Sequence, residues 1–139
     1  MVTLRERRGV TMADEMGIFR VDVDIEHPGR LGIRSRVAGA MVDTGSELSW
    51  FPASILEELG IARRTIREFR QASGTIVARW TGTAIVHAEG ISAGDEVVFG
   101  EPGDLVLLGS RTLEGLNLVV DPVSKRLVDA GPAPAAVAA

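Results

Sequence analysis

Residues 38–46 read AGAMVDTGS, and this stretch decides how the chain is interpreted. Small and apolar residues lead up to an acidic residue, Asp43, which is followed by Thr44, Gly45 and Ser46. The apolar part is typical of a strand that enters the interior of a domain, and glycine permits a tight turn with close backbone approach. The stretch therefore predicts a carboxylate at the floor of a cleft. The same tetrapeptide also suits an ordinary turn, which is its commoner occurrence.

The composition of the chain excludes several chemistries. The chain has 139 residues, 45% of them hydrophobic and 24% charged, as expected for one small globular domain. It contains no cysteine, which excludes disulfides, thiol nucleophiles and cysteine-ligated metals. His27 and His87 are the two histidines, so a multi-histidine metal site is nearly excluded as well. We therefore expect no metal and no cofactor.

Charge and hydropathy also limit the partners. The formal net charge of −4 argues against nucleic acid as the main partner. No apolar run reaches the roughly 18–20 residues that cross a bilayer. Residues 1–10 carry basic side chains with no apolar stretch after them, which argues against a secretory signal. We predict a cytoplasmic protein that binds neither nucleic acid nor a membrane.

Period-two alternation is the main structural pattern of the chain. Phe19, Val21, Val23 and Ile25 alternate with charged residues, which predicts a half-buried strand. Turns containing glycine or proline separate further short apolar runs. We expect strands at 18–25, 33–42, 66–72, 75–81, 83–89, 97–99, 105–108, 118–120 and 126–128, and short helices at 54–59 and 112–116. This spacing predicts an all-β fold with one or two short helices, arranged as a compact sandwich or barrel.

The ends of the chain differ from its middle. Residues 1–16 are polar and mixed, and we expect a flexible N-terminal lead there. Residues 130–139 read AGPAPAAVAA, a low-complexity composition typical of a disordered tail. A single folded domain is expected between them, at 17–129.

A second motif, Leu107-Leu108-Gly109, follows Asp43 after a hairpin whose tip is Ser73-Gly74. On its own it is a buried strand that ends in glycine. An apolar strand with Asp-Thr-Gly, then a glycine-tipped hairpin, then two hydrophobic residues and a glycine resembles the retropepsin-like aspartic proteases. These are single-domain relatives of the retroviral proteases. The resemblance spans residues 18–128 and agrees in both order and spacing.

The resemblance implies a closed retropepsin-like barrel with one Asp-Thr-Gly lobe per chain. Asp43 matches the catalytic aspartate of an active-site loop that continues through Thr44, Gly45 and Ser46. The threonine of this family bonds across a dimer, and the glycine backbone meets the substrate. The expected substrate-binding residues are Gly45, Glu47 and, at the tip of a flap, Ser73, Gly74 and Thr75. Packing beneath the aspartate loop is expected from Leu107, Leu108 and Gly109.

The chemistry of peptide hydrolysis implies a second carboxylate. Water must lose a proton to a base, while an acid protonates the carbonyl oxygen or the leaving amine. Two carboxylates about 3 Å apart share one proton, because they cannot both ionise cheaply, and so supply the base and the acid. This chain has one Asp-Thr-Gly and no duplicated half. We therefore predict an aspartic endopeptidase that acts as a homodimer on a peptide or protein substrate, with Asp43 from each copy.

Some features depart from the family pattern and leave alternatives open. Arg111 stands one place later than the arginine of many relatives, which leaves its pairing with Glu47 open. The alanine-rich C-terminus does not look like the interleaved strand of retroviral proteases, so a dimer contact through the hairpin at Asp121 is an alternative. The chain could also be a catalytically silent protease-fold homodimer that binds peptides or serves a structural or interaction role. A third alternative is a small β-rich binding protein in which Asp-Thr-Gly is only a turn.

Four further residues are interpreted from their neighbours alone. Trp50 and Phe51 are expected in the core or an interface, with a pocket wall as the second alternative. Asp95 and Glu96 are expected to be ordinary surface acids.

Overall fold

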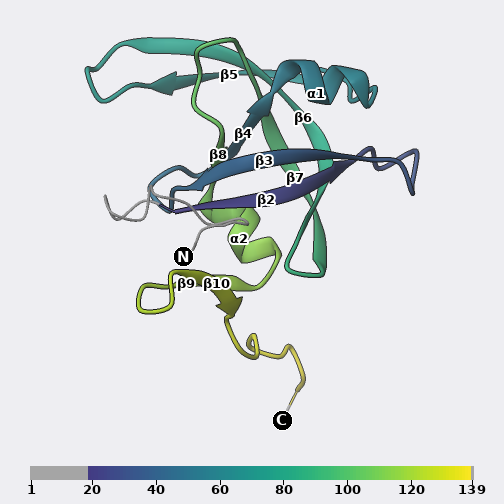
Figure 1. Cartoon of the computed structure of the whole chain (residues 1–139), viewed down its shortest axis with the longest axis vertical. Helices are drawn as coiled ribbons and strands as arrows, with labels where there is room; N and C mark the ends of the chain where they lie inside the picture. The colour runs from purple at the N-terminus through teal and green to yellow at the C-terminus, as the bar shows by residue number, and fades with distance from the viewer. Residues whose placement is uncertain (1–18, 139) are drawn as a thin grey trace.

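The computed structural model describes residues 19–138, which form nine β-strands and two short helices (Figure 1). The mostly β architecture confirms the predicted fold class at that level. The predicted lead at 1–16 lies outside the described residues, and residues 130–138 form no helix or strand. Neither of the helices in the described part of the chain is long and apolar enough to cross a membrane.

Seven strands form one continuous sheet. They are β2 (Arg20–Glu26), β3 (Arg34–Val42), β4 (Ser49–Pro52), β5 (Thr65–Arg70), β6 (Ile76–Ala88), β7 (Ile91–Gly100) and β8 (Leu107–Leu108). Their spatial order is β2-β3-β8-β4-β7-β6-β5, with β3–β8 and β4–β7 parallel. β2 also pairs with the second half of β6, where Ile25 lies opposite Val86. This extra pairing closes the sheet into a ring.

The β5–β6 hairpin is the roof of the site described below. Among the described strands β5 pairs only with β6, and the hairpin runs along the top of Figure 1. In its turn, the Gln71 N–H donates to the Thr75 carbonyl at 2.8 Å, and the Gly74 N–H donates to the Gln71 carbonyl at 2.8 Å. Gly74 has φ +93° and no other atom within 4 Å of a built Cβ, so the turn requires glycine for its backbone conformation. The predicted glycine-tipped hairpin is confirmed.

The core follows from the alternation of the strands. Val23 and Ile25 are buried while Asp22 and Asp24, which alternate with them on β2, are not, as a half-buried strand requires. Helices α1 (Ala53–Glu58) and α2 (Ser110–Gly115) add apolar side chains, and both helices lie close to their predicted positions. The largest fully buried hydrophobic side chains are Phe51, Phe99, Ile25, Leu56, Leu108, Leu116, Val23, Val86, Val97 and Val98.

A second sheet follows α2. It consists of β9 (Leu118–Asp121) and β10 (Arg126–Asp129), which pair antiparallel as the turn at Asp121 predicts. Leu118 and Leu127 are buried against the core, whereas Val119 is 46% exposed. Figure 1 places this hairpin below α2, on the opposite side of the molecule from the β5–β6 hairpin.

Several strand predictions were wrong in detail. The run expected at 97–99 is the end of a ten-residue strand, β7. The runs expected at 75–81 and 83–89 form one strand, β6, because Gly82 does not break it. A Cβ at Gly82 would lie 2.4 Å from the Ala62 carbonyl oxygen, so this glycine serves a close packing contact. The run at 105–108 is reduced to the two residues of β8, and β4 was not expected at all.

Candidate active site

Asp43 lies in a turn directly after β3. Its N–H donates to the Leu108 carbonyl on β8 at 3.0 Å, and the Ser46 N–H donates back to the Asp43 carbonyl at 3.1 Å. The Gly45 N–H donates to Asp43 Oδ1 at 2.9 Å, which orients the carboxylate. Asp43 is half-buried, whereas Thr44 and Gly45 are exposed. The turn therefore presents a positioned carboxylate beside an open surface.

Gly109 packs directly behind this turn. A Cβ at Gly109 would lie 2.6 Å from the Leu48 carbonyl oxygen and 2.8 Å from the Ser46 carbonyl oxygen, so no larger residue fits without movement. Two backbone bonds run alongside the contact: the N–H of Ser110 donates to the Ser46 carbonyl at 2.8 Å, and the N–H of Arg111 donates to the Glu47 carbonyl at 3.0 Å. Gly109 and the two residues after it therefore contact the loop that carries Asp43.

A chain of buried hydrogen bonds extends this support. The Gly109 N–H donates to Ser49 Oγ at 2.9 Å, and Ser49 Oγ lies 2.5 Å from Thr112 Oγ1. The Thr112 hydroxyl donates to Asp95 Oδ2 at 2.6 Å. Ser49 and Thr112 are almost completely buried, so each hydroxyl needs these partners. The chain ties the floor under Asp43 to β7.

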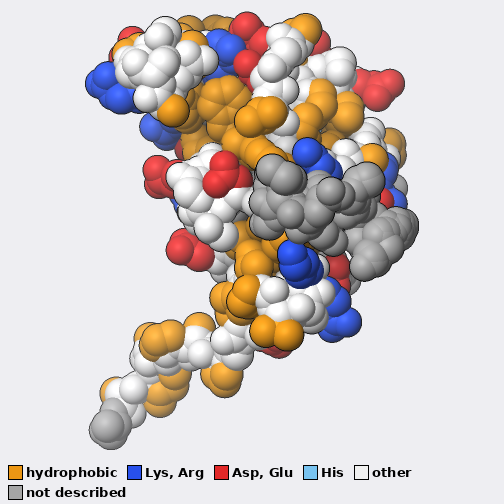
Figure 2. All heavy atoms as spheres, turned by 60° about the vertical axis from the view of Figure 1, so that its left-hand side comes forward, with side chains coloured by type: hydrophobic (Ala, Val, Ile, Leu, Met, Phe, Trp, Pro, Cys, Tyr) orange, Lys and Arg blue, Asp and Glu red, His pale blue; other side chains and the backbone are white. Residues whose placement is uncertain are grey.

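Asp43 lines a pocket of about 490 Å³ between the turn and the β5–β6 hairpin. Figure 2, which brings the left-hand side of Figure 1 forward, shows hydrophobic side chains gathered in the upper part of this face. The wall residues come from four separate segments of the chain. They are Trp50, Phe69, Arg70, Gln71, Ala72, Val77, Arg79, Gly103, Asp104, Leu105 and Leu107.

The apolar walls of the pocket contact one another. The rings of Trp50 and Phe69 meet edge to face, with centroids 4.9 Å apart. Phe69 and Val77 lie opposite each other on the hairpin and are its half-buried positions together with Arg79. Trp50 therefore forms a pocket wall, the second of its two predicted roles, whereas Phe51 is fully buried in the core.

An ion pair crosses the pocket wall. Arg79 donates from Nε to Asp104 Oδ2 at 2.7 Å and from Nη2 to Asp104 Oδ1 at 2.9 Å. The hydrogen bonds from Arg79 and from the Glu101 N–H hold the pKa of Asp104 below its usual value, although burial acts the other way. The pocket beside Asp43 thus has an apolar wall and a charge-balanced wall.

A second hollow of about 420 Å³ lies on the other side of Phe69. It is bordered by the Ser46–Leu48 segment, by β5 from Ile66 to Phe69, and by Arg111. Glu47, one of the predicted substrate-binding residues, is exposed at this hollow. Phe69 lines both hollows.

The predicted flap-tip residues lie farther out than the pocket. Ser73, Gly74 and Thr75 are exposed at the turn of the hairpin, and the pocket is lined instead by their neighbours Gln71 and Ala72. The Ser73 hydroxyl donates to Thr75 Oγ1 at 3.1 Å, within the turn itself. The structure thus brings together Asp43 and Leu107 but leaves the predicted tip residues at the margin.

The expectation that Asp95 and Glu96 are ordinary surface acids was wrong. Asp95 ends the buried hydrogen-bond chain, and Glu96 pairs with Arg67 and accepts a hydrogen bond from the Thr81 hydroxyl at 2.7 Å. The bond from Arg67 is the main cause that lowers the pKa of Glu96, with Thr81 also contributing. Both acids are half-buried because β7 turns inward at this point.

The side chain of Arg111 contacts neither oxygen of the Glu47 carboxylate. Its guanidinium lies 3.8 Å from Glu96 and 4.0 Å from Asp95. Its contact with Glu47 is through the backbone N–H alone. Arg111 is therefore directed toward β7, and the pairing with Glu47 that the sequence left open is not formed.

Sequence reasoning did not single out Phe69, Arg79 or Asp104 as site residues. The available pattern was alternation along the hairpin, which puts Phe69, Val77 and Arg79 on one face once the register is known. No short motif marks Asp104, because its role depends on a partner 25 positions away.

Two carboxylates line this pocket in the described part of the chain. Asp43 is the acid at the pocket floor, and Asp104 is already neutralised by Arg79. Within residues 19–138 no group of three or more His, Cys, Asp or Glu side chains could hold a metal ion. The arrangement can position one carboxylate against a bound extended chain.

In comparisons with known proteins, no family model matches the chain and no curated protein matches it. The resemblance to retropepsin-like proteases therefore rests on the motifs and their placement.

Proposed function

We propose that the chain is an aspartic endopeptidase of retropepsin-like type, with a closed barrel and one Asp-Thr-Gly lobe per copy. The observation that carries the proposal is the placement of Asp43: a carboxylate held by the Gly45 N–H faces a pocket roofed by a glycine-tipped hairpin. Gly109, the last residue of the second motif, packs against the same turn. The Asp-Thr-Gly and Leu-Leu-Gly motifs, which are far apart in the sequence, are therefore neighbours in the structure.

The proposed enzyme is a homodimer, because one lobe holds one half of the acid pair. A two-fold axis beside the exposed Thr44–Gly45 turn brings two Asp43 carboxylates together. One carboxylate accepts a proton from the attacking water, and the other donates its proton to the carbonyl oxygen. The resulting diol intermediate then breaks its C–N bond as the amine takes up a proton. No cofactor and no covalent enzyme intermediate are needed.

The substrate is an extended peptide or protein segment between the Asp43 turn and the hairpin. One side chain enters the pocket walled by Trp50, Phe69 and Leu105, which favours a large apolar group. The hairpin excludes water above the scissile bond. Backbone groups of the peptide bond to the turn and the hairpin, in the manner of an added strand.

The dimer contact that we favour is the β9–β10 hairpin. Within residues 19–138 these strands pair only with each other, and Val119 is 46% exposed on β9. A strand with an unpaired edge and an exposed apolar side chain is suited to pairing with a second copy.

The substitution Asp43→Asn tests the proposal. Denatured casein is incubated with the full chain between pH 3 and pH 7, with and without a pepstatin-type inhibitor. We expect cleavage by the parent chain that the inhibitor blocks, and loss of cleavage in Asp43→Asn with the dimer mass retained. Asp24→Asn, which removes an acid from the exposed face of β2, is the matched control and should stay active.

Two results would refute the proposal: full activity in Asp43→Asn, or no cleavage by a parent chain that is shown to be dimeric. In the second case, tight binding of the casein peptides would favour the catalytically silent alternative. A strict monomer at high concentration would favour the small binding protein.

A further inference from the structure

Arg79 sits where the arm of the β5–β6 hairpin meets the rest of the pocket. It is the last pocket-lining residue of β6, and its side chain is 15% exposed. Its guanidinium lies 6.0 Å from the ring centroid of Trp50 on β4. Its carboxylate partner, Asp104, is 18% exposed and lies in the loop between β7 and β8. The Arg79 side chain therefore lies between β4 and the β7–β8 loop and is bonded to the loop.

The donors of Arg79 are committed to the protein. Nε and Nη2 form a two-pronged pair with Asp104, and Nη1 donates to the Ala78 carbonyl at 2.9 Å. Nη1 also lies 3.8 Å from the Glu101 carboxylate. A guanidinium used in this way holds elements together, and is not free to bind an acidic ligand.

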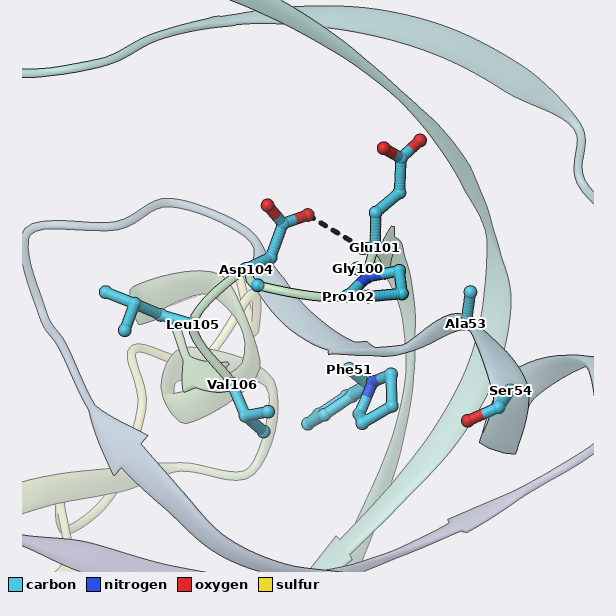
Figure 3. A pocket seen from close by; sticks show the side chains of 11 residues that line it. Phe51, Ala53, Ser54, Gly100, Glu101, Pro102, Asp104, Leu105 and Val106 are labelled. Carbon is cyan, nitrogen blue, oxygen red and sulfur yellow. Dashed lines mark hydrogen bonds between the residues drawn. The ribbon is translucent and has the colours of Figure 1, made fainter.

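The loop that carries Asp104 is itself shaped around that carboxylate. Figure 3 shows Asp104 bonded to the backbone of Glu101, and the Glu101 N–H donates to Asp104 Oδ2 at 2.7 Å. In the same view Val106 points toward Phe51 in the core, whereas Leu105 points away from it. Leu105 lines the pocket beside Asp43 and is 65% exposed. The position of Asp104 thus determines where Leu105 is presented.

The loop also leads directly to the floor of the site. The Val106 carbonyl accepts the Met41 N–H at 2.9 Å, and the Leu108 carbonyl accepts the Asp43 N–H. The hairpin tip, in contrast, has open space around Gly74. The Arg79–Asp104 ion pair therefore connects the hairpin, whose tip is surrounded by open space, to the loop that is bonded to the strand and turn carrying Asp43.

We propose that the Arg79–Asp104 ion pair is a clamp that holds the arm of the β5–β6 hairpin against the loop 101–106 and sets how far the pocket beside Asp43 opens. Both residues are positioning residues, since neither touches the reacting atoms in the proposed mechanism. This inference rests on the proposed function only for its consequence in catalysis. The closed state of the pocket is a property of the single chain.

Quenching of Trp50 fluorescence by acrylamide tests the clamp without any substrate. The chain has two tryptophans, and Trp80→Phe removes the exposed one, so the remaining emission reports on the pocket wall. In this background we compare Asp104→Asn and Arg79→Lys with Asp24→Asn. The last variant breaks an Arg–Asp pair of the same kind, Arg36 Nε to Asp24 Oδ1 at 2.7 Å, on the far strands β2 and β3.

We expect Asp104→Asn to raise the Stern–Volmer constant of Trp50 roughly twofold or more, because an open pocket exposes a ring that is now half-buried. Arg79→Lys keeps the charge but loses the two-pronged geometry, and should give an intermediate rise. Asp24→Asn should match the parent. Far-UV circular dichroism identifies any variant that does not fold. If Asp104→Asn does not fold, the quenching of Arg79→Lys decides.

The clamp is refuted if the folded clamp variants quench like the parent, or if Asp24→Asn quenches as strongly as Asp104→Asn. These outcomes are separate from those of the proposed function. A change in quenching without any peptidase activity would keep the clamp and remove the enzyme. Peptidase activity with unchanged kcat and KM in Asp104→Asn would keep the enzyme and remove the clamp.

Discussion

Replacing Gly109 by alanine should disturb the floor of the site more than any other single methyl group added there. The added Cβ would lie 2.6 Å and 2.7 Å from the carbonyl oxygen and carbon of Leu48, and 2.8 Å from the oxygen of Ser46. These neighbours are backbone atoms of the loop that carries Asp43, so they cannot rotate away as a side chain would. The loop must retreat as a unit.

The cost can be estimated from the contacts that change. Overpacking of a well-packed site costs about 1–3 kcal/mol. The Gly109 N–H also loses good geometry to the buried Ser49 hydroxyl, a bond of about 1 kcal/mol. We therefore expect Gly109→Ala to lower the free energy of unfolding by about 2–4 kcal/mol, which is a large share of the total for a domain of this size.

Urea denaturation followed by circular dichroism measures this change, with the slope against urea checked for constancy. Gly94→Ala is the matched control, because no atom lies within 4 Å of its Cβ and its φ is not left-handed. It should be neutral or stabilising by up to about 1 kcal/mol. A Gly109→Ala chain within about 0.5 kcal/mol of Gly94→Ala would refute the packing argument.

Gly82→Ala separates the stability effect from the effect on the site. Its Cβ would lie 2.4 Å from the Ala62 carbonyl oxygen, so a comparable loss of stability is expected there. Gly82 does not line the pocket beside Asp43. In the proposed enzyme, Gly109→Ala should therefore reduce peptidase activity more than Gly82→Ala does, once both are compared at a temperature where each is folded.

Three further predictions concern the hairpin, the acids and the dimer. Gly74→Val places a branched residue at φ +93° in the open turn, and should lower turnover more than it lowers the urea midpoint; equal turnover would argue against a moving roof. Glu96 and Asp104 have pKa values lowered by their arginine partners, so their stabilisation is complete above pH values of 4.5 and 3.8 and is lost on acidification. The unfolding free energy should therefore fall below about pH 4, and Asp104→Asn should flatten that fall. Val119→Asp should weaken self-association in analytical ultracentrifugation without unfolding the chain, because this side chain is exposed.

The parts of the fold that the sequence predicted are those determined by local periodicity. Val23 and Ile25 are buried because they alternate with charged residues, and a pattern of two is visible within a few positions. The same reasoning failed at Gly82. A glycine inside a strand suggests that the strand ends there, and the contact that explains this glycine is with the Ala62 carbonyl, which is distant in sequence. β4 was missed because Ser49–Pro52 is short and lies directly before a helix.

The site divides in the same way. Asp43 and Gly109 could be predicted as site candidates because each lies in a short motif, and there is a physical reason for each residue type in that motif. Arg79 and Asp104 could not, since either residue alone is an ordinary charged side chain. The antiparallel pairing of β6 with β7 brings Arg79 beside the start of the β7–β8 loop, and this pairing lets the two residues meet.

The two parts of the site also differ in rigidity: the turn that carries Asp43 (the floor) is firmly held, whereas the β5–β6 hairpin above the pocket (the roof) can move. The floor is held by backbone bonds between β3 and β8 and by the buried hydroxyls of Ser49 and Thr112, none of which can be lost without leaving a buried polar group unpaired. The roof is a hairpin whose outer strand pairs with one neighbour in the described chain and whose arm is tied to the rest of the pocket by the half-buried Arg79–Asp104 ion pair. In the proposed enzyme, motions that admit a peptide should therefore be confined to the hairpin, while the Asp43 carboxylate keeps its place throughout.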